Sequence, residues 1–331
     1  MAARAATTTT VSAPGKILLA GGYLVLEAPN VGFVVAADKR FYTSIDSSDD
    51  DDGISKNSDE TVITVVSPQF HVEWKYFYDH KQHKLHSDNG ANPSVNPFVE
   101  KTLRVCLLYL LKQQQQLPGS AASLPLALKI TIRADNDFYS VLPHLPKTKG
   151  ATGEEGIDRS PTAVEALAPF RNCPVDGDGR AIVNKTGLGS SAALTTSLVG
   201  ALVYFVHKIQ SDSNTKTEED DEWKERIHNL AQICHCHAQG KVGSGFDVSA
   251  ACHGTHVYTR FPKCLLPDLL QQLDDIEGHE NHNTDNLCQT LHRLVELVPW
   301  KDEMVKKDNI ALPKGELQIM LADVRGGSES P

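Results

Sequence analysis

Three glycine-rich segments of the sequence each contain a lysine, and phosphate is the ligand that this combination suits best. The segments read APGKILLAGGYLVLE at residues 13–27, NKTGLGSSAA at residues 184–193 and AQGKVGSGFDVSAACHG at residues 238–254. Glycines let a backbone approach an anion without a Cβ in the way, and the unpaired amides at the start of a helix attract negative charge. Because the chain carries a net charge of −10, three such pairings predict one convergent site for a polyphosphate.

The middle segment fits three phosphate-binding patterns to different degrees. A P-loop places its lysine after the second glycine, whereas Lys185 precedes Gly187 here, so that pattern fails. The dinucleotide fingerprint matches as letters through Gly187, Gly189 and a later alanine, but the preceding strand and the acidic residue about 20 positions further on are missing. What remains is an anion site formed by the amides of residues 188–192, or a plain glycine turn capped by Ser190.

Together the three segments resemble a known family. PGKILLAGGYLVLE, GLGSSAA and GKVGSGFDVSA are similar to the three N-terminal signatures of the GHMP kinases, the superfamily of galactokinase, homoserine kinase, mevalonate kinase and phosphomevalonate kinase. Within it, AGGYLVLE, NDFYS at residues 136–140 and AQGKVGSGFDV most resemble the eukaryotic phosphomevalonate kinases. The resemblance spans residues 12 to about 260, with a weaker continuation to residue 328.

The resemblance implies a role for each segment, with ATP and Mg²⁺ as cofactors. Lys16 and Asp247 are the implied catalytic residues, and Ser191 is the implied Mg²⁺ ligand. The implied ATP-phosphate contacts are Lys185, Thr186, Gly187, Leu188, Gly189, Ser190, Ser191 and Ala192. The implied acceptor contacts are Tyr23, Tyr139, Ser140, Lys241 and Ser244, although Val141 and Leu142 stand where the family pattern has a basic residue after FYS.

Simpler interpretations remain open for three of these residues. Lys16 suits a surface lysine at a strand end, Asp247 a helix N-cap, and Lys185 a solvated loop. In the implied reaction the acceptor is itself a phosphate, mostly ionised near neutral pH, so Asp247 need not abstract a proton. Cations are indispensable where two anions must meet, and Lys16 is the first choice, followed by Lys241 and Lys185.

The histidine-rich patterns do not predict a metal centre. In CHCH at residues 234–237, Cys234 and His237 give at most two ligands on one face of a helix. HENH at residues 279–282 does not match the helical H-E-x-x-H pattern of zinc enzymes.

Hydrophobic patterns predict an α+β chain that can hold this site. Short β-branched or alternating runs predict strands at residues 16–19, 32–37, 42–45, 61–66, 126–133 and 315–322. Longer periodic runs predict helices at residues 97–111, 190–209, 222–238, 247–252 and 287–298, the second apolar on nearly all sides. Polar, low-complexity runs at residues 47–60, 112–123, 144–160, 211–222 and 274–286 predict solvated loops.

Composition narrows the partners. A chain of 331 residues with a net charge of −10 lacks the basic surface that nucleic acid or anionic lipid requires, so we expect a small phosphorylated substrate, no nucleic acid and no membrane, with a monomer or weak dimer. The N-terminus MAARAATTTT has no apolar core of a secretory signal, which predicts a cytoplasmic protein. Seven cysteines then fit reduced thiols better than disulfides.

The resemblance also implies a domain plan. We expect a flexible tail at residues 1–11 and an ATP-binding domain like domain 2 of ribosomal protein S5 at residues 12–260, with acidic insertions at 47–60, 144–160 and 211–222. Residues 261–331 would begin a ferredoxin-like C-terminal domain. That domain is expected to be incomplete, because the chain stops at LADVRGGSESP, within what resembles the third family motif.

Three functional hypotheses follow. The first is an ATP-dependent kinase that converts 5-phosphomevalonate to 5-diphosphomevalonate in isoprenoid and sterol biosynthesis, shortened here. The second is a kinase for a related acceptor such as mevalonate. The third is a non-catalytic nucleotide-binding relative, which the short C-terminus favours and the retention of Lys16, Ser191 and Asp247 opposes.

Overall fold

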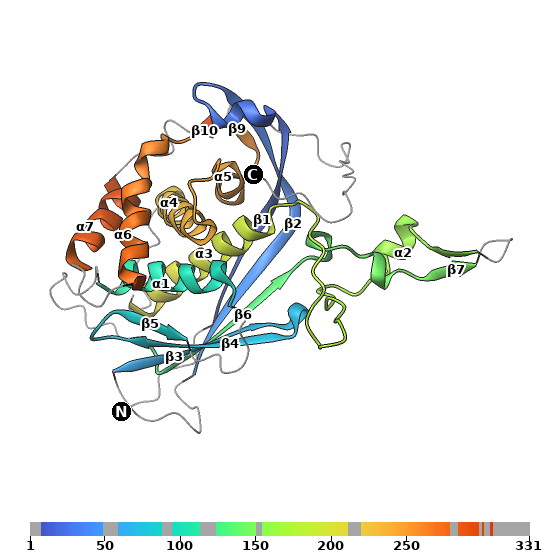
Figure 1. Ribbon diagram of the computed structural model, residues 1–331, viewed down its shortest axis with the longest axis horizontal. Coiled ribbons are helices and arrows are strands. Elements are labelled where there is room, and N and C mark those ends of the chain that lie inside the picture. The colour runs from blue at the N-terminus through green and yellow to red at the C-terminus, as the bar shows by residue number, and fades with distance from the viewer. Residues whose placement is uncertain are drawn as a thin grey trace.

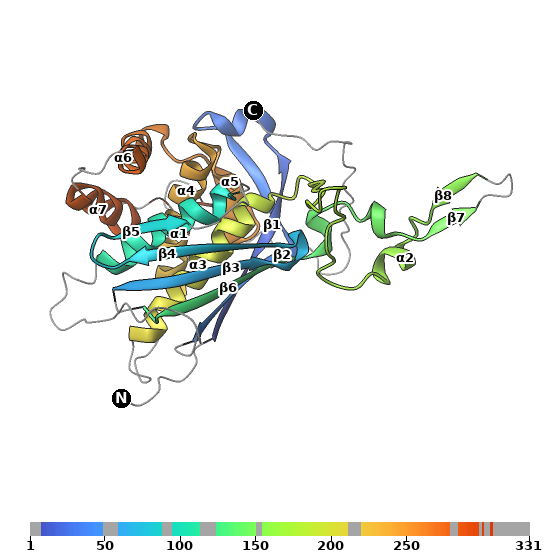
Figure 2. The same ribbon diagram turned by 60° about the horizontal axis from the view of Figure 1, so that its bottom comes forward.

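The computed structural model describes residues 8–48, 59–87, 95–112, 124–149, 154–210, 220–278, 284–297, 300 and 305–306. Within these residues one curled sheet forms a layer, the main helices gather on one side of it, and a narrow arm projects from the body (Figure 1). The same arrangement is visible when the molecule is turned (Figure 2). The mixture of strands and helices confirms the α+β class expected from the sequence.

The sheet runs in the order β10-β9-β2-β6-β3-β4-β5, and β1 pairs with β2 outside this path. β3 and β6 are parallel, and the other pairs are antiparallel. Buried residues largely alternate with more exposed ones along β4 and β6, as expected of a sheet with one covered face. The strands are β1 (Thr8–Ala20), β2 (Val31–Ser48), β3 (Glu60–Ser67), β4 (Val72–Asp79), β5 (Lys84–Ser87), β6 (Ala127–Ala134), β9 (His256–Thr259) and β10 (Val305–Lys306).

β1 and β2 form the long hairpin that carries Lys16. The register of the hairpin shifts between Pro14 and Lys16. Proline has no N–H to donate to a strand ladder, so an irregularity at this point is expected. The hairpin turns through a 3-10 segment at Gly22–Leu26, where Val25 is buried and Tyr23 is exposed.

Four helices make the layer above the sheet: α1 (Pro97–Lys112), α3 (Ser190–Gln210), α4 (Asp220–Gln239) and α5 (Phe246–His253). α3 lies at the centre, in contact with β1, β2, α1, α4 and α5. It is long and apolar enough to cross a membrane by length and composition, but 78% of its apolar window is buried inside the fold. α3 is therefore a core helix, as its nearly uniform apolar sequence predicts.

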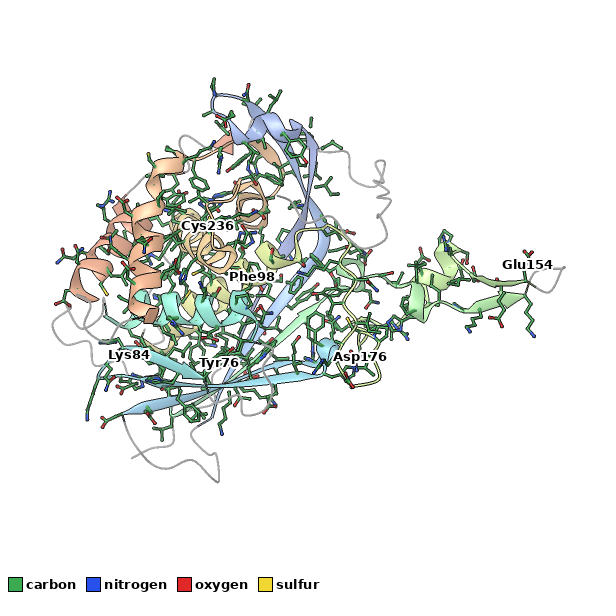
Figure 3. All side chains as sticks on the ribbon, viewed as in Figure 1. Tyr76, Lys84, Phe98, Glu154, Asp176 and Cys236 are labelled. Atoms are coloured by element: carbon green, nitrogen blue, oxygen red, sulfur yellow. The ribbon has the colours of Figure 1, made fainter. Side chains whose placement is uncertain are left out.

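The projecting arm consists of β7 (Lys147–Lys149), β8 (Glu155–Ile157) and α2 (Pro161–Glu165), and Glu154 lies near its tip (Figure 3). Every residue of the two strands is exposed. Ser160 caps α2, since its side-chain oxygen accepts a hydrogen bond from the Ala163 N–H at 3.2 Å. The hairpin buries none of its own residues.

Most of the described residues after 260 pack on the helical layer, while β10 joins the sheet beside β9. α6 (Pro267–Gly278), α7 (Thr284–His292) and the π-helical segment Arg293–Leu297 contact α1 or α4. Trp300 is buried against Phe261, and its indole N–H donates to the Leu294 carbonyl at 3.0 Å. The expected strand at 315–322 and the glycine-serine segment at 321–331 lie outside the described residues.

Several expected elements agree closely with the structure. The helices expected at 97–111, 190–209, 222–238, 247–252 and 287–298 correspond to α1, α3, α4, α5 and α7 with its π-helical continuation. The strands expected at 61–66 and 126–133 correspond to β3 and β6, and the strand expected at 16–19 is the last part of β1. β4, β5 and β9 were not expected.

Four expectations were wrong in part. Residues 8–11 of the expected tail belong to β1, because β-branched threonines suit a strand and the Thr8 hydroxyl donates to Asp46 at 2.7 Å. The strands expected at 32–37 and 42–45 are one strand, β2. The loop expected at 144–160 contains the β7–β8 hairpin, and that expected at 274–286 contains the end of α6 and the start of α7. The insertions at 47–60 and 211–222 lie mostly outside the described residues.

Candidate phosphate-binding site

The first and second glycine-rich segments meet at the bulge in β1. The Lys16 N–H donates to the Leu188 carbonyl at 2.8 Å, which ties the strand to the GLGSS loop. This contact requires Gly15, because a Cβ at that position would lie 2.9 Å from the same carbonyl oxygen. The close approach explains why glycine stands directly before the lysine.

The side chain of Lys16 runs along the same loop. Its Nζ donates to the Gly187 carbonyl at 3.1 Å and lies 5.5 Å from the centre of the Phe246 ring. Gly189, at φ 77°, leaves room for the lysine stem, since a Cβ there would meet Lys16 Cε at 2.9 Å. Burial lowers the pKa of Lys16 from its usual value, and the nearby negative charge of Asp247 partly opposes that shift. The ammonium group of this partly exposed residue thus lies beside the glycine-rich loop, where it has lost part of its hydration.

α3 begins at Ser190, immediately after this loop. The first amides of a helix have no partner within the helix, so those of residues 190–192 face the region where the loop ends. A helix N-terminus of this kind favours an anion through its amides and its dipole. The start of α3 directly after the loop is the geometry that an anion site would need, and anion binding there stays a prediction.

The third glycine-rich segment brings Asp247 to the same place. Asp247 lies in the first turn of α5, where its Oδ1 accepts from the Val248 N–H at 3.0 Å. Its Oδ2 lies 3.9 Å from Nε2 of His235, and the same nitrogen is 3.1 Å from the Ser191 hydroxyl oxygen. One histidine of α4 thus stands between the serine and the carboxylate that the sequence singled out.

His235 was not expected at this site. Its side chain is only 3% exposed, and it packs 5.5 Å from the ring of Phe98, which Figure 3 labels beside Cys236 in the helical layer. Burial lowers the pKa of His235, while the charge of Asp247 raises it. The CHCH pattern gave no signal for this role, because the partners of His235 are distant in sequence.

The NDFYS turn contacts the residues just before the GLGSS loop. The Ser140 N–H donates to the Asn184 carbonyl at 2.8 Å, and the Thr186 hydroxyl donates to the Asp137 carbonyl at 2.5 Å. Tyr139 is 8% exposed and packs edge-on to Phe70 and Phe41, where burial raises the pKa of its phenol. A pocket beside the turn is lined by Tyr139, Ser140, Asn136, Asn184, His144 and Arg171.

The other residues expected to contact the substrates are exposed or partly exposed. Lys185 and Lys241 are exposed, and so is Tyr23, at 78%. Ser244 accepts a hydrogen bond from the Tyr258 hydroxyl through its carbonyl, at 2.6 Å. The structure thus gathers Lys16, the GLGSS loop and Asp247 closely.

Arg260 fixes the third segment and was also missed by the sequence. Its guanidinium donates to the carbonyls of Leu26, Val242 and Gly243 at 2.9, 3.0 and 2.6 Å. Arg260 is 8% exposed, and its bonds to the three carbonyls are partly buried. One buried arginine therefore ties the turn after β1 to the loop before α5. Because its partners are backbone carbonyls, which every residue has, no sequence pattern could have predicted this contact.

No group of three or more His, Cys, Asp or Glu side chains among the described residues is arranged to hold a metal ion. The CHCH residues instead make separate contacts. His237 Nε2 lies 3.1 Å from Asp274 Oδ1, and the Cys106 and Cys234 sulfurs lie 3.9 Å apart in the core.

Comparison with known proteins defines the class to which this site belongs. The family model of GHMP kinases N-terminal domains matches residues 179–255, which include the GLGSS loop, α3, His235 and Asp247. This part of the chain is therefore similar to a GHMP kinase N-terminal domain.

Within that class, the similar curated proteins are phosphomevalonate kinases. The one from Gibberella zeae is 35% identical over 98% of this chain and 65% of its own length. The peroxisomal one from Arabidopsis thaliana is 36% identical over 77% of this chain and 51% of its length, and that of Candida albicans is 32% identical over 97% and 61%. The chain thus spans between about half and two thirds of the length of these relatives.

Two of the solved structures to which the chain is similar serve as examples. Streptococcus pneumoniae phosphomevalonate kinase in complex with phosphomevalonate and AMPPNP is 15% identical, with a TM-score of 0.43 over 87% of this chain and 57% of that one. Methanococcus jannaschii mevalonate kinase is 12% identical, with a TM-score of 0.41 over 90% of this chain and 75% of that one.

Proposed function

We propose that this chain is the nucleotide-binding part of an ATP-dependent kinase that phosphorylates 5-phosphomevalonate to 5-diphosphomevalonate. The observation that carries the proposal is the convergence of Lys16, the GLGSS loop and Asp247 at the start of α3. Similarity to phosphomevalonate kinases over nearly the whole chain supports this choice of acceptor.

The proposed roles follow from charge and position. Residues 185–192 wrap the ATP phosphates with the amides at the start of α3, and Lys16 neutralises charge between donor and acceptor. Lys241 and Ser244, on the loop that Arg260 fixes, face the acceptor together with Tyr23, Tyr139 and Ser140. Because the acceptor phosphate is already ionised, Asp247 acts on orientation and on the charge of Lys16 rather than as a base.

The residues at the site fit Mg²⁺ bound together with ATP. Mg²⁺ usually takes one or two protein oxygen ligands and completes its shell with phosphate oxygens and water. Ser191 and Asp247 supply one hydroxyl and one carboxylate on either side of His235 Nε2. We infer that Ser191 is the hydroxyl ligand, and that the bound ion would screen the charge of the phosphates.

The wider setting remains a prediction. The division into domains at residues 12–260 and 261–331 is a prediction, and so are a monomer or weak dimer and a cytoplasmic location. One similar protein, from Arabidopsis, is named as peroxisomal, so location is a property to be measured by imaging the tagged protein in its own cell.

The proposal is tested by measuring ADP formation by the 331-residue chain with ATP and Mg²⁺. Parallel reactions would contain 5-phosphomevalonate, mevalonate or no acceptor. We expect turnover with 5-phosphomevalonate at least about tenfold above that with mevalonate, since the proposed cations would hold a phosphorylated acceptor and find no phosphate on mevalonate. Faster turnover with mevalonate would replace the proposed acceptor, and ATP binding without ADP formation on either acceptor would show a non-catalytic nucleotide-binding protein.

A further inference from the structure

His235 occupies a position between two residues of the proposed site. It lies on α4, while Ser191 is in the first turn of α3 and Asp247 in the first turn of α5. Its Nε2 is within hydrogen-bonding distance of the Ser191 oxygen, at 3.1 Å, and beyond it from the Asp247 carboxylate, at 3.9 Å. With its side chain 3% exposed, the ring cannot turn into water and is held by its surroundings.

The hydrogen bond fixes the direction of a hydroxyl that would otherwise rotate. A serine hydroxyl has one proton and two acceptor lone pairs, and its rotor settles where its partners are. When Nε2 accepts the proton of Ser191, the lone pairs of the oxygen stay available to a cation. Metal ligands in proteins are commonly oriented in this way by a neighbouring side chain, and losing that neighbour costs about 10–100-fold in affinity or activity.

We propose that His235 is a positioning residue that orients the Ser191 hydroxyl toward Mg²⁺-nucleotide. This inference rests on the proposed function, since it concerns how the same site holds its nucleotide. It assigns to the buried imidazole a role through Ser191, with no contact to the reacting atoms.

The test compares two replacements that fill similar space. His235→Leu removes the polar tip, whereas His235→Gln places an amide near the position of Nε2 and restores a hydrogen-bond partner. His237→Gln is the matched control, because His237 is 1% exposed on the same helix but bonds to Asp274 of α6. Circular dichroism melting curves of all three variants establish that each is folded.

The main readout is the dissociation constant of AMPPNP for the full chain, measured by calorimetry with and without Mg²⁺. We expect His235→Leu to lose about 10–100-fold of the strengthening that Mg²⁺ gives, with Mg²⁺-free binding changed less than about twofold. His235→Gln should recover most of that loss, and His237→Gln should behave as wild type. An unchanged Mg²⁺ effect in His235→Leu, or no recovery in His235→Gln, would overturn the proposal.

A double-mutant cycle shows whether His235 acts through Ser191. In a Ser191→Ala background, His235→Leu should have no further effect on the Mg²⁺ dependence, because the hydroxyl that it orients is gone. Equal and additive losses in the two backgrounds would show that His235 has a structural role separate from Ser191.

A third measurement needs no ligand. The ring ¹⁵N shifts of His235, recorded by NMR on wild type and on Ser191→Ala, should differ if the hydrogen bond exists in solution, and identical shifts would refute the contact. Wild type that fails to bind AMPPNP with Mg²⁺ overturns the proposed function and this inference together. Wild type that binds while the variants match it overturns this inference alone.

Discussion

Replacing Lys16 with methionine separates the charge of this residue from its packing. Methionine keeps an unbranched stem that can lie along Gly189. The lysine stem packs so closely there that a Cβ added at Gly189 would lie 2.9 Å from Lys16 Cε. The ammonium group, its hydrogen bond to the Gly187 carbonyl and its contact with the Phe246 ring are lost. The change therefore removes one cation from the site and leaves the backbone contact of Lys16 with Leu188 intact.

The expected loss of turnover is large because the charge has lost part of its hydration. A cation about 4 Å from a phosphate oxygen contributes roughly 4 kcal/mol at an effective dielectric constant of about 20. Removing one preorganised donor from an active site typically lowers kcat by about 10²–10³-fold, or roughly 3–4 kcal/mol. We expect Lys16→Met to lower kcat by about two orders of magnitude or more.

Stability should move in the opposite direction, or not at all. The pKa of Lys16 is lowered chiefly by burial, so folding disfavours the charged form of this side chain. An uncharged replacement relieves that cost. We expect a melting temperature equal to or above that of wild type, which excludes misfolding as the cause of lost turnover.

The assay is ADP formation with ATP, Mg²⁺ and 5-phosphomevalonate, together with thermal melting. Lys208→Met is the matched control, since Lys208 lies in the last turn of α3, at the opposite end of this helix from the GLGSS loop, and donates to the Thr8 carbonyl at 3.1 Å on an exposed surface. Its turnover should equal that of wild type. Near-normal turnover in Lys16→Met would remove this lysine from the mechanism and refute the reasoning above.

Three further predictions follow from the same contacts. Gly189→Ala and Gly187→Ala are measured side by side, and the kcat of Gly189→Ala should be lower by about tenfold or more. Both glycines have a positive φ, 77° and 76°, but only at Gly189 would a Cβ strike Lys16. Arg260→Met should lower the free energy of unfolding in urea by about 2 kcal/mol or more, since three partly buried carbonyls lose a charged donor; an unchanged urea midpoint would contradict this. Burial lowers the pKa of His228 to about 4, so the unfolded chain, with a histidine pKa near 6.5, binds a proton first as the pH falls. The free energy of unfolding, measured in urea titrations, should therefore be constant in its His228 contribution above about pH 6.5 and fall by about 3 kcal/mol between that pH and pH 4. The variant His228→Asn should show a smaller fall.

The elements that sequence patterns predicted well are those with strong local signals. α3 was expected at 190–209 and spans Ser190–Gln210, because its apolar residues and the glycine before Ser190 mark both its character and its start. β4 was missed although Trp74, Tyr76 and Tyr78 alternate along it, a signal that a period of two makes visible. β9 has only four residues, too short to show a pattern.

The residues of the candidate site also differ in how strongly the local sequence indicates them. Lys16, Gly189 and Asp247 could be singled out from the sequence because each belongs to a glycine-rich segment whose composition indicates phosphate chemistry; their roles stay predictions. His235 and Arg260 were missed because their function depends on partners brought close by folding: Ser191 precedes His235 by 44 residues, and Arg260 reaches back 234 residues to Leu26. Spacing along one segment carries no information about such contacts.

The arrangement of charges suits the role that we propose for Asp247, which is not that of a base. Burial lowers the pKa of Lys16, and the negative charge of Asp247 opposes that shift. In the proposed reaction the acceptor phosphate is already ionised, so no proton has to be removed from it, whereas a cation between the two anions is needed throughout the transfer. We therefore propose that Asp247 contributes most by favouring the charged form of Lys16. Since the Val248 amide holds one of its oxygens at 3.0 Å and the other faces His235, the carboxylate is fixed in the position from which it can do so.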